Sequence, residues 1–82
     1  MIKIAVVASN IDETFDWLRH TKDTDIIIKT ERKAVSTTNQ IEYIIITRVE
    51  HAYGYMFDDM TIAPNYFDVL PTVVRGRLKI NA

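Results

Sequence analysis

The chain has 82 residues, of which 48% are hydrophobic and 26% are charged, and its formal net charge is −1. This length has room for one hydrophobic core, so we expect a single domain over residues 1–82. The absence of cysteine excludes disulfides and thiolate metal sites. The near-zero charge excludes a global attraction to nucleic acid or anionic membranes. No apolar run approaches the roughly 20 residues that span a bilayer, and the N-terminal residues do not resemble a signal peptide. We therefore expect a cytoplasmic protein without a membrane partner.

The first 21 residues predict a strand followed by a helix. Residues 2–8 are apolar almost without interruption, which is typical of a central strand covered on both faces. Asn10 then stands three residues before Glu13, the spacing of a helix cap. One apolar face follows at helical spacing, with Trp17 at its margin. The residues of that face are Ile11, Phe15 and Leu18.

Two further strands are predicted over 24–30 and 41–48, each around a run of three isoleucines that we expect to be buried. The segment between them is polar, has no helical periodicity, and is short for a parallel crossover. We therefore favour a long antiparallel hairpin with a solvent-exposed tip. A short helix over 31–37 within an all-parallel sheet is the alternative.

The last third of the chain predicts one helical turn, one strand and one helix. Residues 48–53 are expected to form the turn, which Gly54 ends by adopting a left-handed conformation. A fourth strand over 59–63 stops at Pro64, and a helix follows from residue 67, with Asp68 as its cap and Pro71 in its first turn. The fold class is α/β, with helices packed on a small mixed sheet of about four strands in the order β-α-β-β-β-α.

The turn after the first strand bears on cofactor binding. It reads Ala8-Ser9-Asn10-Ile11, without the glycines and lysine of a Walker or dinucleotide-binding loop. Both sites are excluded, and we expect no cofactor. Ser9 and Asn10 either cap the helix or form a weaker anion site at its N-terminus.

The histidines and carboxylates show no catalytic or metal-binding spacing. Neither His20 nor His51 has a second histidine one helical turn away, so we expect no metal site. Asp58 and Asp59 are adjacent, so on a strand they would point to opposite faces, and Asp58 is expected to end a loop or cap a backbone group. There is no nucleophile elbow, and we expect a protein that is not an enzyme. A small enzyme that uses His51 and Asp58 is the alternative, and it requires a pocket that joins them.

Basic residues cluster locally despite the neutral total. One group lies on the expected hairpin and another near the C-terminus, and tyrosines are interleaved with them. They could contact phosphates and stack on bases, or they could only protect an edge strand and complement a helix dipole. The candidate binding residues are Ser9, Asn10, Lys29, Arg32, Lys33, Arg48, His51 and Tyr53.

The stretch His51-Ala52-Tyr53-Gly54-Tyr55-Met56-Phe57-Asp58-Asp59-Met60-Thr61-Ile62 resembles the H-x-x-x-G-x-x-F-D-x-V-x-I pattern of RecA-like helicase cores, with one residue fewer between the histidine and the glycine. It also resembles the segment that leads into the Walker B strand of P-loop motors, including phage terminases. The acidic pair that holds magnesium in those motors would fall at Pro64-Asn65, which cannot do so. The resemblance implies a degenerate P-loop-like or Rossmann-like sheet, as in small uncharacterised phage proteins.

The expected function is that of a non-catalytic phage accessory protein in the host cytoplasm, which binds a host or phage macromolecule. Two strands rich in isoleucine need more cover than two helices supply, which predicts a homodimer or a protein partner. The alternative is a small nucleic-acid or nucleotide-binding module that uses the basic hairpin and the tyrosines. That module would bind less tightly as salt increases.

Overall fold

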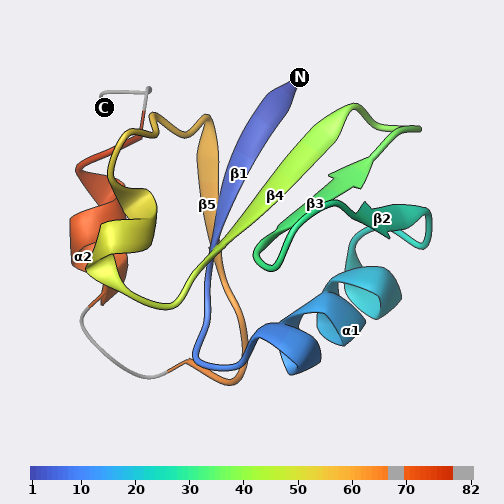
Figure 1. Cartoon of the computed structure of the whole chain (residues 1–82), viewed down its shortest axis with the longest axis horizontal. Coiled ribbons are helices and arrows are strands. Elements are labelled where there is room, and N and C mark those ends of the chain that lie inside the picture. Colours follow the sequence, from blue (N-terminus) through green and yellow to red (C-terminus); the bar gives the residue numbers. More distant parts are fainter. Residues whose placement is uncertain (67–69, 79–82) are drawn as a thin grey trace.

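The computed structural model describes residues 1–66 and 70–78 and shows a five-stranded mixed sheet with helices on both faces (Figure 1). The elements in chain order are β1 (Ile2–Val7), α1 (Ile11–Thr21), β2 (Ile26–Ile28), β3 (Lys33–Ser36), β4 (Ile41–Ile46), the 3-10 helix η1 (Val49–Ala52), β5 (Asp59–Ile62) and α2 (Leu70–Arg75). The strand order is β2-β3-β4-β1-β5. β1 runs parallel to β4 and to β5, whereas β3 is antiparallel to both β2 and β4. The predicted α/β class and mixed sheet are confirmed, and β1 has the expected central position.

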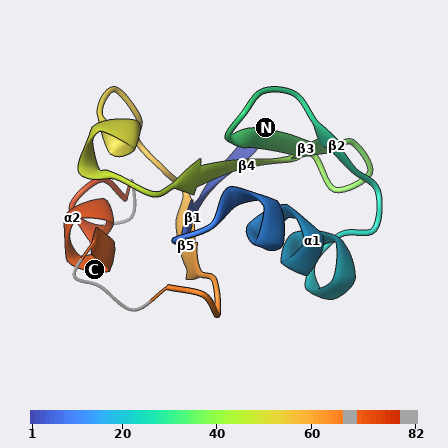
Figure 2. The same ribbon diagram turned by 60° about the horizontal axis from the view of Figure 1, so that its bottom comes forward.

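Each face of the sheet has its own hydrophobic core. Val6 and Ile45 point to one face, where Phe15 and Leu18 of α1 cover them. The alternate residues of the same strands point to the other face, where η1 and α2 pack around the fully buried Phe57. Figure 2 shows α1 beneath β3 and β4, whereas η1 and α2 lie together on the far side of β1 and β5. The near-continuous hydrophobicity of β1 follows from this burial on both faces.

The long hairpin expected between residues 24 and 48 is wrong, as is the alternative with a helix at 31–37. Four residues of the expected tip, Lys33–Ser36, form β3, which lies between β2 and β4 and pairs with both. Ala34, Val35 and Ser36 are buried, although the tip was expected to be exposed to solvent. The sheet therefore has five strands instead of about four. Two short turns, one on each side of β3, replace the single long hairpin loop that was expected. The sequence did not reveal β3, because a strand of four residues has too few apolar positions to show a period of two.

The expectation that the isoleucines of β2 are buried is correct only for Ile26. Ile26 is 6% exposed and joins the core under α1, whereas Ile27 is 48% and Ile28 is 43% exposed. β2 is the edge strand of the sheet, and η1 and α2 pack against the opposite half, on β1, β4 and β5. Ile27 therefore lies on a part of the sheet that those helices do not reach.

Several local predictions are confirmed. Asn10 caps α1, with its side-chain Oδ1 accepting the backbone N–H of Glu13 at 3.0 Å. Gly54 has a positive φ of 84°, a conformation that glycine adopts without strain. Pro71 lies in the first turn of α2, and the expected cap Asp68 lies outside the described residues. Asp58 caps a backbone group, since its Oδ2 accepts the N–H of Lys3 at 2.8 Å.

None of the helices in the described part of the chain is both long enough and apolar enough to cross a membrane.

Candidate functional site: the crevice at the carboxyl edge

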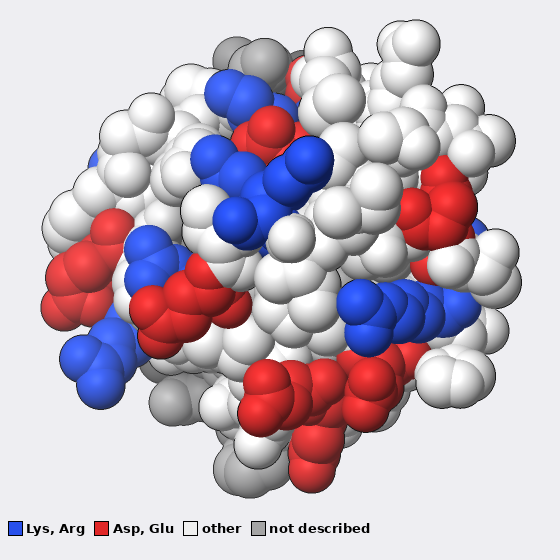
Figure 3. Space-filling view, turned by 45° about the vertical axis from the view of Figure 1, so that its right-hand side comes forward, with Lys and Arg blue, Asp and Glu red and all other residues white. Residues whose placement is uncertain are grey.

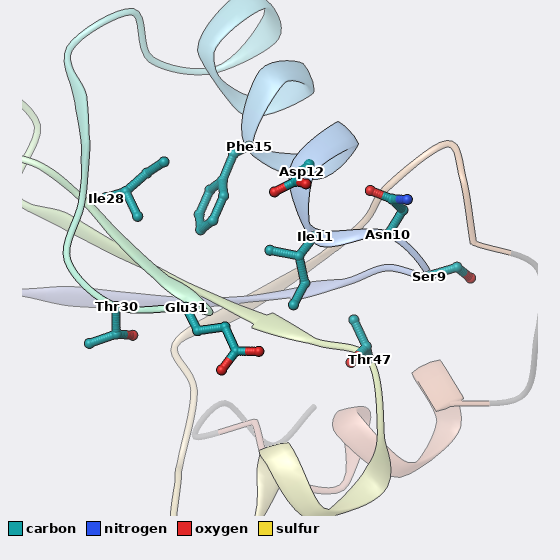
Figure 4. A pocket seen from close by; sticks show the side chains of 9 residues that line it. All are labelled: Ser9, Asn10, Ile11, Asp12, Phe15, Ile28, Thr30, Glu31 and Thr47. Atoms are coloured by element: carbon teal, nitrogen blue, oxygen red, sulfur yellow. The ribbon is translucent and has the colours of Figure 1, made fainter.

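The chain leaves two neighbouring parallel strands in opposite directions at the carboxyl edge of the sheet. β1 is followed by α1 on one face, and β4 is followed by η1 on the other. In open α/β sheets such a switch point creates a crevice in which ligands commonly bind. A crevice of about 580 Å³ opens here, between the start of α1 and the segment that joins β2 to β3 (Figure 4). Its lining residues are Ser9, Asn10, Ile11, Asp12, Phe15, Ile28, Thr30, Glu31 and Thr47.

The lining combines an apolar wall with two carboxylates. Figure 4 shows Ile11, Phe15 and Ile28 around the space between α1 and the β2–β3 segment, with Asp12 and Glu31 on opposite sides of it. The ion pair found among the described residues joins Lys33 to Glu42, so neither crevice carboxylate takes part in it. The crevice itself therefore holds two carboxylates beside an apolar surface.

The first turn is closed by a side chain from the other end of the chain. Asn65, which follows β5, accepts the backbone N–H of Ser9 at 2.8 Å and that of Asn10 at 3.4 Å through its Oδ1. Its Nδ2 donates to the Oγ1 of Thr14 at 3.3 Å. These two amides would be available to a phosphate group in a phosphate-binding turn. Here they are bonded to Asn65, which supports the capping interpretation of this turn.

A basic group lies beside the crevice, around His51. The ring Nδ1 of His51 accepts the backbone N–H of Thr47 at 3.3 Å and lies 3.2 Å from its Oγ1. Burial lowers the pKa of His51, and the positive charges of Arg32 and Arg48 lower it further. The neutral ring is thus favoured at the end of β4. Three of the residues predicted from the sequence, Arg32, Arg48 and His51, are brought together here.

The other predicted basic and aromatic residues lie elsewhere. Lys33 reaches Glu42 at 3.6 Å, and its Nζ lies 5.9 Å from the ring centre of Tyr55. Tyr53 is exposed, with the guanidinium of Arg77 5.2 Å from its ring centre. Lys29 is exposed just after β2. Figure 3 shows positive and negative side chains interspersed over the face that it presents, rather than a field of one sign.

His51 and Asp58 do not share a pocket. His51 follows β4 at the carboxyl edge, whereas Asp58 precedes β5 and binds the amide of Lys3 near the start of β1. The two side chains therefore lie at opposite ends of the parallel strands, and the geometry required for the enzyme hypothesis is absent. Among the described residues, no three histidines or carboxylates gather in a way that could hold a metal ion.

Sequence reasoning placed Ser9 and Asn10 at the site but missed most of the crevice. No motif in the sequence marks Asp12, Glu31 or Thr47 as binding residues, although Thr47 lies at the end of a predicted strand. The carboxyl-edge rule applied to every parallel strand would have selected Thr47 and Asn65. Glu31 could not be found in this way, because it enters the crevice only through the turn into β3.

Comparisons of this chain with protein-family models, with curated proteins and with solved structures find no match.

Proposed function

We propose that this chain is a non-catalytic binding protein whose crevice receives a basic side chain from a protein partner. The observation that carries the proposal is the combination of Asp12 and Glu31 with the apolar wall of Ile11, Phe15 and Ile28. A lysine or arginine side chain has the matching chemistry. Its apolar stem packs on hydrophobic surface while its charged end meets carboxylates.

The open shape of the crevice supports a side chain on an extended segment as the occupant. It lies at the sheet edge, between α1 and the β2–β3 segment, and about 580 Å³ is enough for a long side chain with part of its backbone. Ser9, Thr30 and Thr47 add hydroxyl groups that can bond to the polar groups of such a segment. Arginine fits better than lysine, since its planar fork can bond to a carboxylate through two parallel N–H groups.

Peptide display on the immobilised protein tests this proposal. Selection against the wild type should enrich peptides that carry arginine or lysine between apolar residues. The double variant Asp12→Lys/Glu31→Lys should lose at least about tenfold in affinity for them, because it places positive charge opposite the positive charge of the ligand, and like charges across an interface are costly. Glu13→Lys/Asp59→Lys is the matched control, because Glu13 shares the first turn of α1 with Asp12 but does not line the crevice.

Two outcomes would overturn the proposal. One is recovery of the same peptides, with equal affinity, by the crevice variant and the wild type. The other is enrichment of acidic peptides. The phage setting, the P-loop-like ancestry and the alternative of nucleic-acid binding stay predictions. Neighbouring genes would test the first, and titration with single-stranded DNA at low salt would test the last.

A further inference from the structure

β2 is an edge strand whose outer side is ready to pair. Lys29 donates its N–H to the carbonyl of Lys33 at 2.8 Å, in register with the β2–β3 pair Ile27↔Val35. Because backbone groups alternate along a strand, the N–H and C=O of Ile27 face β3, and those of Ile26 and Ile28 face outward. Within residues 1–66 and 70–78, β2 has no strand neighbour on that side, as Figure 1 shows.

The edge formed by β2 exposes more apolar surface than a protected edge strand usually does. Proteins commonly protect an edge by keeping it short or by placing lysine on it, and both features occur here, in the three residues of β2 and in Lys29. That protection does not account for Ile27 and Ile28, which expose nearly half of their surface on the two faces of the strand. An apolar residue exposed on each face of an open edge is the pattern that a further strand would cover.

We propose that β2 pairs antiparallel with β2 of a second copy of this chain, about a two-fold axis at Ile27. The outward backbone N–H and C=O groups of Ile26 then bond to those of Ile28 in the other copy. The two-fold axis generates a second, identical pair between Ile28 and Ile26 of the other copy. Ile27 meets its own symmetry copy, so that two isoleucine side chains that are each 48% exposed cover each other.

Charge complementarity supports a second copy in this register. The sequence around β2 reads Asp25-Ile26-Ile27-Ile28-Lys29, so the two-fold axis places Asp25 opposite Lys29 of the other copy, twice. Asp25 is ionised at neutral pH like any aspartate in contact with solvent, and hydrogen bonds from Thr38 and Ser36 lower its pKa further. Both of its carboxylate oxygens accept bonds within its own chain, so Lys29 of the other copy meets its charge without replacing those bonds. A parallel arrangement would instead place residues of like charge side by side. Pairing of such short strands belongs to the small, weak class of interfaces, so we expect association that depends on concentration.

Sedimentation velocity over a range of concentrations tests the pairing. The wild type should show a reversible monomer–dimer equilibrium. Ile28→Pro should raise the dissociation constant at least about tenfold, because proline removes the outward N–H without removing any bond to β3. Ile28→Ala is the matched control, since it shortens the side chain and keeps the N–H, and it should remain closer to the wild type.

A charge reversal gives a second test that does not touch the strand backbone. Lys29→Glu places a carboxylate opposite Asp25 and should weaken the dimer, whereas Arg75→Glu, at an exposed position of α2, should not. Lys29→Glu keeps the proposal testable even if Ile28→Pro fails to fold.

The register has its own test, because the chain contains no cysteine. Ile27→Cys would face its copy at a Cα separation of about 4.5 Å, within the range of a disulfide, and should form a covalent dimer on mild oxidation. Lys29→Cys would lie about 13 Å from its copy and should not. Equal cross-linking at both positions would contradict the register, and a monomeric wild type at all concentrations would overturn the proposal. Ile28 also lines the crevice. The variants at Ile27 and Lys29 leave the crevice lining unchanged, so they separate failure of the pairing from failure of the crevice proposal.

Discussion

The side chain of Asn65 closes the turn that begins at Ser9, 56 residues away, with its Oδ1 2.8 Å from the Ser9 backbone nitrogen. This contact joins the end of β5 to the start of α1 across the carboxyl edge of the sheet. It also occupies a position where a phosphate group would accept the same amide in a nucleotide-binding turn. The segment after β5 thus supplies a neutral capping group to the first turn.

Replacing Asn65 should therefore affect stability through this turn. We expect Asn65→Ala to lower the free energy of unfolding by about 1 kcal/mol, because two helix-proximal amides lose their acceptor and water replaces it only in part. Asn65→Asp should lose less stability than Asn65→Ala, since a carboxylate accepts the same amides and is favoured near a helix N-terminus, but it cannot replace the bond that Nδ2 donates to Thr14. Urea unfolding followed by circular dichroism measures both. Equal midpoints for the alanine variant and the wild type would show that the contact contributes nothing.

A second prediction concerns the buried carboxylate of Asp23. The hydroxyl of Tyr43 donates to its Oδ2 at 2.6 Å, and Asn39 donates to its other oxygen. Tyr43→Phe leaves this carboxylate, which is only 7% exposed, with one donor fewer. We expect a loss of about 2 kcal/mol in the free energy of unfolding, the usual cost for a hydrogen bond to a charged group. Tyr53→Phe, on an exposed ring, should leave the free energy of unfolding unchanged.

The same tyrosine predicts a loss of stability in alkali. Burial raises the pKa of Tyr43, as do the hydrogen bond to Asp23 and the negative charge of that residue. The unfolded chain therefore loses this proton at about pH 10, while the folded chain still holds it. The free energy of unfolding should fall as the pH rises above about 10, and part of that fall should be absent in Tyr43→Phe. An identical alkaline slope for the two proteins would contradict the assignment.

The fourth prediction concerns how the titration of His51 changes stability at mildly acidic pH. Its pKa is lowered in the folded protein by burial and by Arg32 and Arg48, so the unfolded chain takes up this proton first as the pH falls. The neutral ring of His51 makes its full contribution to the free energy of unfolding above about pH 6.5, and this contribution is lost progressively as the pH falls below that value. Protonation also removes Nδ1 as the acceptor for the Thr47 amide.

Urea midpoints measured from about pH 7.5 down to about pH 5 check this prediction. The wild type should weaken over that range, and His51→Gln should show a smaller slope. His20→Gln is the control, because His20 is exposed on α1, and it should keep the slope of the wild type. The assignment to His51 fails if His51→Gln and the wild type have the same slope.

The amino-acid sequence by itself determined the elements whose signals are local. The cap at Asn10, the apolar face of α1, the positive φ of Gly54 and the stop at Pro64 each depend on neighbouring residues, and each was found where it was expected. The central position of β1 followed from its continuous hydrophobicity, because a strand covered on both faces has no polar side.

Only the tertiary structure decided which strands are neighbours and which side chains meet. Lys33–Ser36 becomes a strand because β2 and β4 supply its partners on both sides, and its own four residues carry too little pattern to show it. Ile27 and Ile28 have the same apolar character as Ile26, and their exposure follows from the edge position of β2. The crevice is decided in the same way. Its walls come from the turns after β1, β2 and β4, and separations along the chain do not reveal that these turns meet at one edge of the sheet.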